Sequence, residues 1–349
     1  MERLRREVRD RLLAAFGEPL RHGQLRDLGL GDHDVQRLVR NGSLQRAHGK
    51  YLDGAMDPRL ATIRGALAAH PRSVVSHQTA AELSGLRVWS DGSAHAPGPS
   101  GAVWLTCEPG ADRRNKTRGD LVLRRATLPP ADLLLVQGLP TTSIARTTVD
   151  LARRLPLAEA VVTVDHALAR EFRREELELV LRRQRHWPGI RRAHRAIAFG
   201  DPRSESALES IARARFEEAG LPAPVLQAQF WDGQWWAEER VDYWWPQYRT
   251  VGEADGLAKF EAPTVKQRRR ALRRAFERDQ RLADRDLELV HFGWEDAVLR
   301  PGDLADRVKA AFARGARRTG PTPRWRTTDP NDPHHWPRPR TAPDLPATG

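Results

Sequence analysis

The first 55 residues place apolar side chains at helical spacing in three short stretches. These stretches span residues 4–16, 24–28 and 32–40. Asn41-Gly42 then stops the third stretch, and residues 44–47 and 51–52 predict two short strands about a tight turn. Helix, helix, turn, helix and two-stranded wing is the order of a winged helix-turn-helix. We therefore predict such a domain over residues 1–55.

Residues 56–200 alternate between extended and helical patterns and predict a mixed α/β and helical middle domain. The expected strands are 73–76, 102–106, 120–124 and 133–136. The expected helices are 60–69 and 77–86, followed by helical spacing that dominates from 144 to 199.

Residues 201–318 predict a third domain with its own order of elements. That order is helix 204–220, strands 225–231, 239–245 and 249–254, helix 265–283, strand 287–292 and helix 303–313. It is the α-β-β-β-α-β order of the PD-(D/E)XK (restriction-endonuclease-like) core. Residues 319–349 are rich in proline with little to bury, so we expect a disordered tail. The predicted fold class is α/β with several domains.

The charge balance adds a prediction about partners. Lys and Arg number 58 against 46 Asp and Glu, which gives a net charge of +12. This excess indicates a polyanion such as nucleic acid, although an arginine-rich composition from a GC-rich gene explains it equally well. No apolar run is long enough to predict a membrane span, and the first residues do not read as a secretion signal. A single cysteine, Cys107, excludes an intramolecular disulfide, so we expect a cytoplasmic protein.

The third predicted helix and the wing carry the candidate DNA-binding residues. Gln36, Arg37 and Arg40 lie off the apolar stripe of the helix, where they can pair with adenine and guanine edges in the major groove. Arg46 and Lys50 on the wing would contact phosphate. The alternatives are a solvated helical surface and a winged helix used for protein contacts.

Three segments resemble the AbiEi family of antitoxins and transcriptional regulators. They lie within residues 1–170 and read RNGSLQRAHGKYLDG, SVVSHQTAAELSGL and LPTTSIARTTVDLAR. AbiEi proteins are described as the antitoxin half of type IV toxin–antitoxin systems. The resemblance implies a winged-helix domain that binds promoter DNA and represses its own operon. It also implies a following domain that counteracts a nucleotidyltransferase-like toxin.

The third domain carries candidate catalytic chemistry. Asp242 and Glu253 flank a turn, so a regular hairpin places them opposite each other. Two facing carboxylates are costly without a cation, and oxygen ligands suit Mg²⁺ or Mn²⁺. We therefore predict a metal site of Glu209, Asp242 and Glu253. Asp242, Glu253, Asp255 and Lys259 are the predicted catalytic residues, with the metal activating a water and Lys259 contacting phosphate.

This region also resembles relatives of the very-short-patch-repair (Vsr) endonuclease, which occur fused to AbiEi-like regions. The shared pattern pairs an LES-type helix with a D-W-P-like strand, then E-x-D-G and a basic residue. In the general PD-(D/E)XK pattern a lysine takes the second position after the strand acid, whereas here that position is Asp255. The domain is therefore either an active nuclease or an inactive module that keeps the fold.

The sequence leaves three functions open. The leading one is a DNA-binding regulator or antitoxin with a nucleotidyltransferase-like toxin as its protein partner. The second is a Mg²⁺-dependent DNA endonuclease that the N-terminal domain targets. The third is a non-catalytic protein-interaction module.

Overall fold

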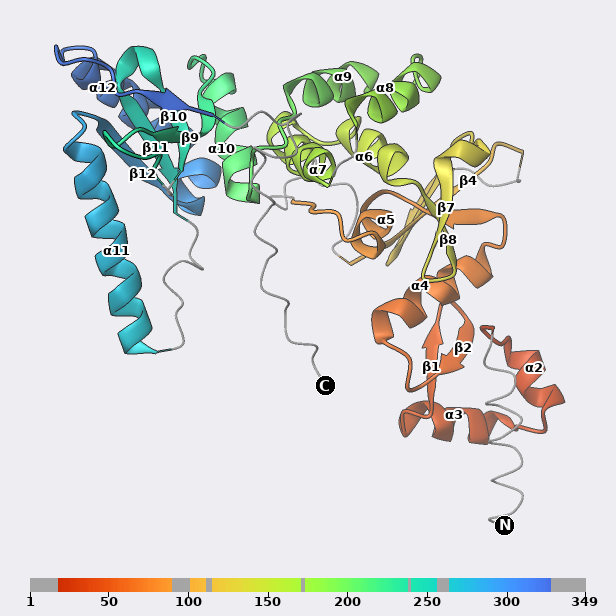
Figure 1. The fold of residues 1–349 in the computed structure, drawn as a ribbon. Helices are drawn as coiled ribbons and strands as arrows, with labels where there is room; N and C mark the ends of the chain where they lie inside the picture. Colours follow the sequence, from red (N-terminus) through yellow and green to blue (C-terminus); the bar gives the residue numbers. More distant parts are fainter. Residues whose placement is uncertain are drawn as a thin grey trace. The chain divides into compact units, whose positions relative to one another are not determined.

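The computed structural model describes residues 18–89, 101–110, 115–170, 173–237, 240–255 and 264–327. The chain divides into two compact units (Figure 1). Unit 1 comprises Met1–Gly85 with Pro97–Thr147, and unit 2 comprises Leu86–Ala96 with Thr148–Gly349. The helix expected at 4–16 lies outside the described residues.

Unit 1 begins with two helices and a hairpin. These elements are α2 (His22–Asp27), α3 (Asp32–Arg40), β1 (Leu44–Ala47) and β2 (Lys50–Asp53). Leu25, Val35 and Leu44 are among the buried side chains that pack them around one small core. His48 and Gly49 join the strands with positive φ at both positions, which is the geometry of a two-residue hairpin turn. The structure confirms the predicted order of helices and strands from α2 to β2.

A six-stranded mixed sheet forms the rest of unit 1, in the order β5-β6-β4-β3-β8-β7. Its strands are β3 (Ser73–Val75), β4 (Val103–Cys107), β5 (Lys116–Arg118), β6 (Leu121–Arg125), β7 (Leu133–Val136) and β8 (Leu139–Thr142), with a 3-10 turn η1 (Pro130–Asp132). Helices α4 (Pro58–Ala69) and α5 (His77–Leu83) pack on it through residues such as Ile63 and Ala80. The sequence did not predict β5, which is short and polar, or β8, which contains a proline.

Unit 2 opens with a group of helices. They are α6 (Ile144–Ala152), which crosses the boundary between the units, α7 (Leu157–Ala169), α8 (Arg174–Arg183), α9 (Ile190–Phe199) and α10 (Ala207–Glu218). Asp165 of α7 accepts hydrogen bonds of 2.8 and 2.9 Å from the Arg213 guanidinium of α10, and both side chains are buried. This contact ties α10 to the preceding helices, so the boundary between compact units falls near residue 147, whereas the sequence predicts one near 200.

The five-stranded sheet of unit 2 has the order β12-β11-β10-β9-β13. Its elements after α10 are β9 (Val225–Phe230), β10 (Val241–Trp245), η2 (Pro246–Tyr248), β11 (Thr250–Ala254), α11 (Val265–Ala283), β12 (Glu288–Phe292), η4 (Glu295–Leu299), α12 (Pro301–Gly315) and β13 (Trp325–Arg326). Only β11 and β12 pair in parallel. These positions confirm the predicted order of helices and strands in this region.

Each face of this sheet has its own apolar core. Trp244 and Val251 pack with Leu282 of α11 on one face. Tyr243 and Trp245 pack edge-to-face against Phe216 of α10 on the other face.

The C-terminal segment departs from the sequence prediction at one point. Trp325 and Arg326 form β13, which pairs antiparallel with Phe230 and Gln229 of β9. The prediction of a disordered tail from residue 319 is therefore wrong for this strand, because backbone pairing with an open sheet edge orders a segment that has little to bury. Residues 328–349 lie outside the described residues. No helix among the described residues is both long and apolar enough to cross a membrane.

Candidate DNA-binding surface and acidic cluster

The outer face of α3 carries three of the predicted DNA-binding residues. Val35 points into the core, whereas Gln36, Arg37 and Arg40 are exposed. The Arg37 guanidinium lies 2.7 Å from the Asp34 carboxylate one turn earlier, and both side chains are exposed. A surface pair of this kind contributes little free energy, so a phosphate or a base can replace it. The face is therefore polar, cationic and accessible.

The hairpin beside α3 carries the other two predicted residues on opposite faces. Arg46 pairs across the ladder with Tyr51, and Ala47 pairs with Lys50. Cross-strand partners share a face and neighbours alternate, so the register places Arg46 and Lys50 on different faces of the hairpin. The Arg46 guanidinium lies 5.9 Å from the Tyr51 ring centroid, and the side chain remains exposed.

Buried Glu209 and half-buried Asp242 form an acidic cluster with Gln227. The Gln227 amide donates to Glu209 Oε2 at 3.1 Å and lies 3.5 Å from Asp242 Oδ1. Glu209 Oε2 also accepts from the Glu205 backbone N–H, and Asp242 Oδ2 accepts from the Ala254 N–H. Burial, together with the nearby negative charge of Asp242, raises the pKa of Glu209 to about 8. The cluster therefore holds a proton at neutral pH.

Glu253 has a different partner from Asp242, although the β10–β11 register, continued by one residue, places the two opposite each other. Glu253 follows two residues after Val251, which puts it on the α11 face of β11. Its Oε1 accepts a 2.6 Å hydrogen bond from Arg278 of α11, which also donates to the Arg240 carbonyl. The Glu253 side chain is 1% exposed and that of Arg278 is 21% exposed. An internal guanidinium thus neutralises this carboxylate.

Asp255 lies in a second polar group on the same sheet. Nδ1 of His291 lies 2.7 Å from Asp255 Oδ2, and its Nε2 lies 3.2 Å from Asp279 Oδ2. The hydrogen bond with Asp255 raises the pKa of His291. Lys259, the predicted phosphate contact, lies outside the described residues. The structure therefore describes contacts for three of the four predicted catalytic residues.

The described contacts do not assemble the predicted magnesium site. Within the described ranges, no group of three or more His, Cys, Asp or Glu side chains is placed to hold a metal. Gln227 presents N–H groups to Glu209 and Asp242, and Arg278 presents its guanidinium to Glu253. The N–H donors occupy carboxylate lone pairs that a cation would otherwise use. The three-carboxylate site stays a prediction.

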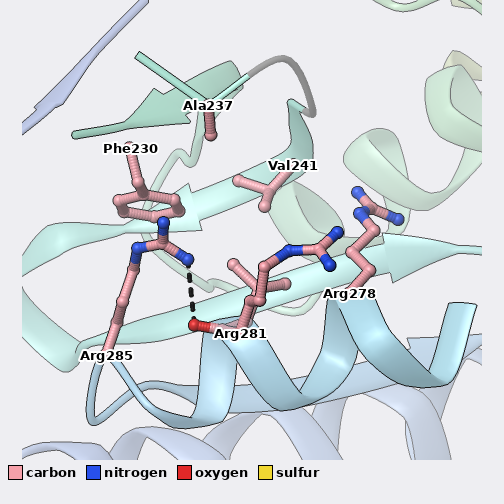
Figure 2. Close-up of a pocket in the computed structure, with 7 residues that line it drawn as sticks. Phe230, Ala237, Val241, Arg278, Arg281 and Arg285 are labelled. Carbon is pink, nitrogen blue, oxygen red and sulfur yellow. Dashed lines mark hydrogen bonds between the residues drawn. The ribbon is translucent and has the colours of Figure 1, made fainter. Parts of the chain in front are cut away.

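A small pocket lies between α11 and the sheet, beside Arg278 (Figure 2). Arg285 donates to the Arg281 carbonyl at its rim. The volume of the pocket is about 10 Å³, which is room for a single water. It is lined by Phe230, Ala237, Val241, Arg278, Arg281, Leu282 and Arg285. The pocket is too small for an organic cofactor.

Comparisons with known proteins place the chain in a family. Residues 73–197 match the family model of the AbiEi antitoxin C-terminal domain. The uncharacterized proteins MT2308 and Rv2248, from two strains of Mycobacterium tuberculosis, are each 32% identical to the chain over 296 residues. That alignment covers 82% of this chain and 98% of each relative. The chain belongs to the Rv2248 family.

The AbiEi match locates the antitoxin-like part of this Rv2248-family chain. It starts at β3, after the α2–α3 region, and ends within α9, so it contains two of the three segments that carry the AbiEi resemblance. The crystal structure of the RV2827C protein from Mycobacterium tuberculosis is a weaker likeness. It shares 18% identity at a TM-score of 0.38, covering 63% of this chain and 84% of that one.

Sequence reasoning missed two residues that organise the acidic side chains of this Rv2248-family member. Gln227 is a buried polar residue within the largely apolar strand β9. Arg278 lies one turn before Leu282 on the inner side of α11. Each could have been flagged as a polar residue at a position where the pattern requires an apolar one.

Proposed function

We propose that this protein is a DNA-binding regulator of the antitoxin class, and that α3 enters the major groove of its operator. The observation that carries the proposal is the exposed face of α3 formed by Gln36, Arg37 and Arg40. The side chains and the nearby wing match the docking mode of a winged helix-turn-helix, in which one helix reads base edges and the hairpin contacts the backbone.

The AbiEi match supports the antitoxin part of the proposal. In this view the protein acts in the cytoplasm, and its protein partner is a nucleotidyltransferase-like toxin encoded beside it. The six-stranded sheet of unit 1 and helices α6 to α9, which the match covers, would contact that toxin. Co-purification of the chain with the product of the adjacent gene tests this part separately from DNA binding.

Fluorescence anisotropy tests the DNA-binding part. The probe is the DNA upstream of the gene, and a scrambled duplex serves as its control. Arg37→Ala with Arg40→Ala should weaken binding to the upstream DNA by about 1–3 kcal/mol per base contact and reduce its salt dependence. Arg72→Ala with Arg125→Ala removes two exposed arginines from elsewhere in unit 1 and should leave binding unchanged. Equal loss in both double variants would overturn the assignment of α3.

A second candidate function is a Vsr-like DNA endonuclease of the PD-(D/E)XK type. The order from α10 to α12 favours it. Buried Glu209 beside Asp242 also favours it, because a buried carboxyl group whose pKa a neighbouring charge raises is typical of catalytic centres. Activity would require Glu253 to leave Arg278, since a guanidinium now neutralises that carboxylate.

Plasmid cleavage tests this second candidate. The full chain is incubated with supercoiled plasmid and Mg²⁺ or Mn²⁺, beside an EDTA control and Glu253→Ala. Nicking that needs both the divalent ion and Glu253 would establish the nuclease. If the wild-type chain does not nick the plasmid, the nuclease proposal is wrong and the regulator proposal is unaffected.

A further inference from the structure

The N-terminal half of α11 concentrates positive charge that neither the acidic cluster nor α3 uses. Residues 264–276 contain six Lys or Arg and no Asp or Glu, in the sequence TVKQRRRALRRAF. Lys266, Arg269, Arg270 and Arg273 are exposed and line one open hollow of about 440 Å³. Their spacing of three, four and seven residues places them on one face of the helix. Figure 1 shows this end of α11 extending past the edge of the sheet.

This charge is unfavourable for an isolated helix. Like charges three or four residues apart repel by a few tenths of a kcal/mol per pair, and cations in the first turns also oppose the helix dipole. Within the described residues no acidic side chain lies in ion-pair range of Lys266, Arg269 or Arg270, while Arg273 pairs with exposed Glu277 at 2.8 Å. A bound polyanion would reverse the repulsion, so the arrangement points to an anionic partner.

The residue types identify the partner. Arginine predominates over lysine, and its planar fork binds phosphate through two parallel hydrogen bonds. Lys266 to Arg273 spans seven residues, or about 10 Å of helix, which matches about three phosphates of one DNA strand along the duplex axis. A membrane-surface helix needs a broad apolar face, yet Phe276 is the only large apolar side chain exposed on α11 among those the structure describes.

We propose that Lys266, Arg269, Arg270 and Arg273 bind the sugar–phosphate backbone of duplex DNA, without sequence preference. This goes beyond the proposed function, because the surface lies in unit 2 and requires neither base reading by α3 nor cleavage. Its effect is to add a second, electrostatic contact to any DNA that unit 1 selects.

The salt dependence of DNA binding tests the proposal on the full chain. The test variant is Arg269→Gln, Arg270→Gln and Arg273→Gln, in which glutamine preserves helix propensity. The matched control is Arg191→Gln, Arg192→Gln and Arg195→Gln, which removes three exposed arginines of similar spacing from α9. Circular dichroism and thermal unfolding establish that both variants fold.

The test variant should lower the slope of log K against log salt by about 2.7, since each phosphate that an arginine neutralises accounts for about 0.9 of the slope. The ratio of the wild-type binding constant to that of the test variant should therefore fall about 40-fold when salt is raised from 50 to 200 mM. The decrease in affinity should be the same for upstream and scrambled duplexes, and the control should match the wild type. Hydrogen exchange should show new protection of α11 amides in the wild-type chain when DNA is added.

Each alternative outcome is distinct. Equal slopes for the test and control variants, with no protection of α11, would overturn the α11 site even if Arg37→Ala with Arg40→Ala abolishes binding. Weaker binding in the α11 variant alone would support this site and overturn the role of α3. Binding of the wild type to phosphatidylserine vesicles that needs the three arginines, with unchanged DNA affinity, would assign the surface to a membrane instead.

Discussion

Glu209→Gln tests the protonation of the buried acidic cluster. The pKa of Glu209 rises from its ordinary value of 4.5 to about 8 because the carboxyl group is buried beside Asp242. Between these two pH values the unfolded chain releases the proton while the folded chain retains it, so stability falls as pH rises. Each pH unit costs about 1.4 kcal/mol, which gives a loss of about 4 kcal/mol between pH 5 and pH 8.

The glutamine variant should not show this loss, because its amide stays neutral and its carbonyl can still accept from the Glu205 N–H. The assay is urea unfolding of both proteins at pH 5, 6, 7 and 8 in EDTA. Hydrogen exchange of peptides from α10 and β10 assigns the transition to unit 2. The variant should gain stability over the wild type with each step in pH. Parallel pH profiles would show that Glu209 is ionised in the native state and would refute the reasoning.

Other buried or crowded groups give further expectations. Arg278→Met should cost about 3–5 kcal/mol because buried Glu253 loses its cation, and adding Glu253→Gln should restore most of that loss in urea unfolding. Gly65→Ala should cost about 1–3 kcal/mol because its methyl would meet a β1 carbonyl oxygen at 2.6 Å, whereas Gly23→Ala, with nothing within 4 Å, should melt no lower than the wild type. Burial lowers the pKa of His166 to about 4, so stability should fall as pH drops from 6.5 toward 4, and a His166→Gln melting profile should lack this decline.

The sequence predicts the long and strongly periodic elements well. The strands and helices of unit 2 fall within a few residues of expectation, because apolar positions and turn residues mark their limits. Short strands such as β5 and β13 are held by backbone pairing with a neighbour, which a local pattern does not record.

The candidate site was harder to predict because its geometry depends on individual residues. The β10–β11 register, continued by one residue, places Asp242 opposite Glu253. Their partners nevertheless differ, because Gln227 contacts Asp242 and Arg278 donates to Glu253. The pairing of Glu253 with Arg278 joins residues 25 positions apart across a helix–sheet contact. Composition and spacing do not encode which of several arginines reaches a buried carboxylate.

Strand β13 also affects self-association of the protein through the edge of its sheet. Without it, the six residues of β9 would form the border of the sheet, with a row of unpaired backbone groups open to another chain. With it, Phe230 and Gln229 are paired, and the added two-residue strand ends at the exposed charge of Arg326. Short, charged borders resist the strand addition that leads to aggregation. A short strand from the proline-rich segment thereby helps to protect this edge of the sheet from strand addition.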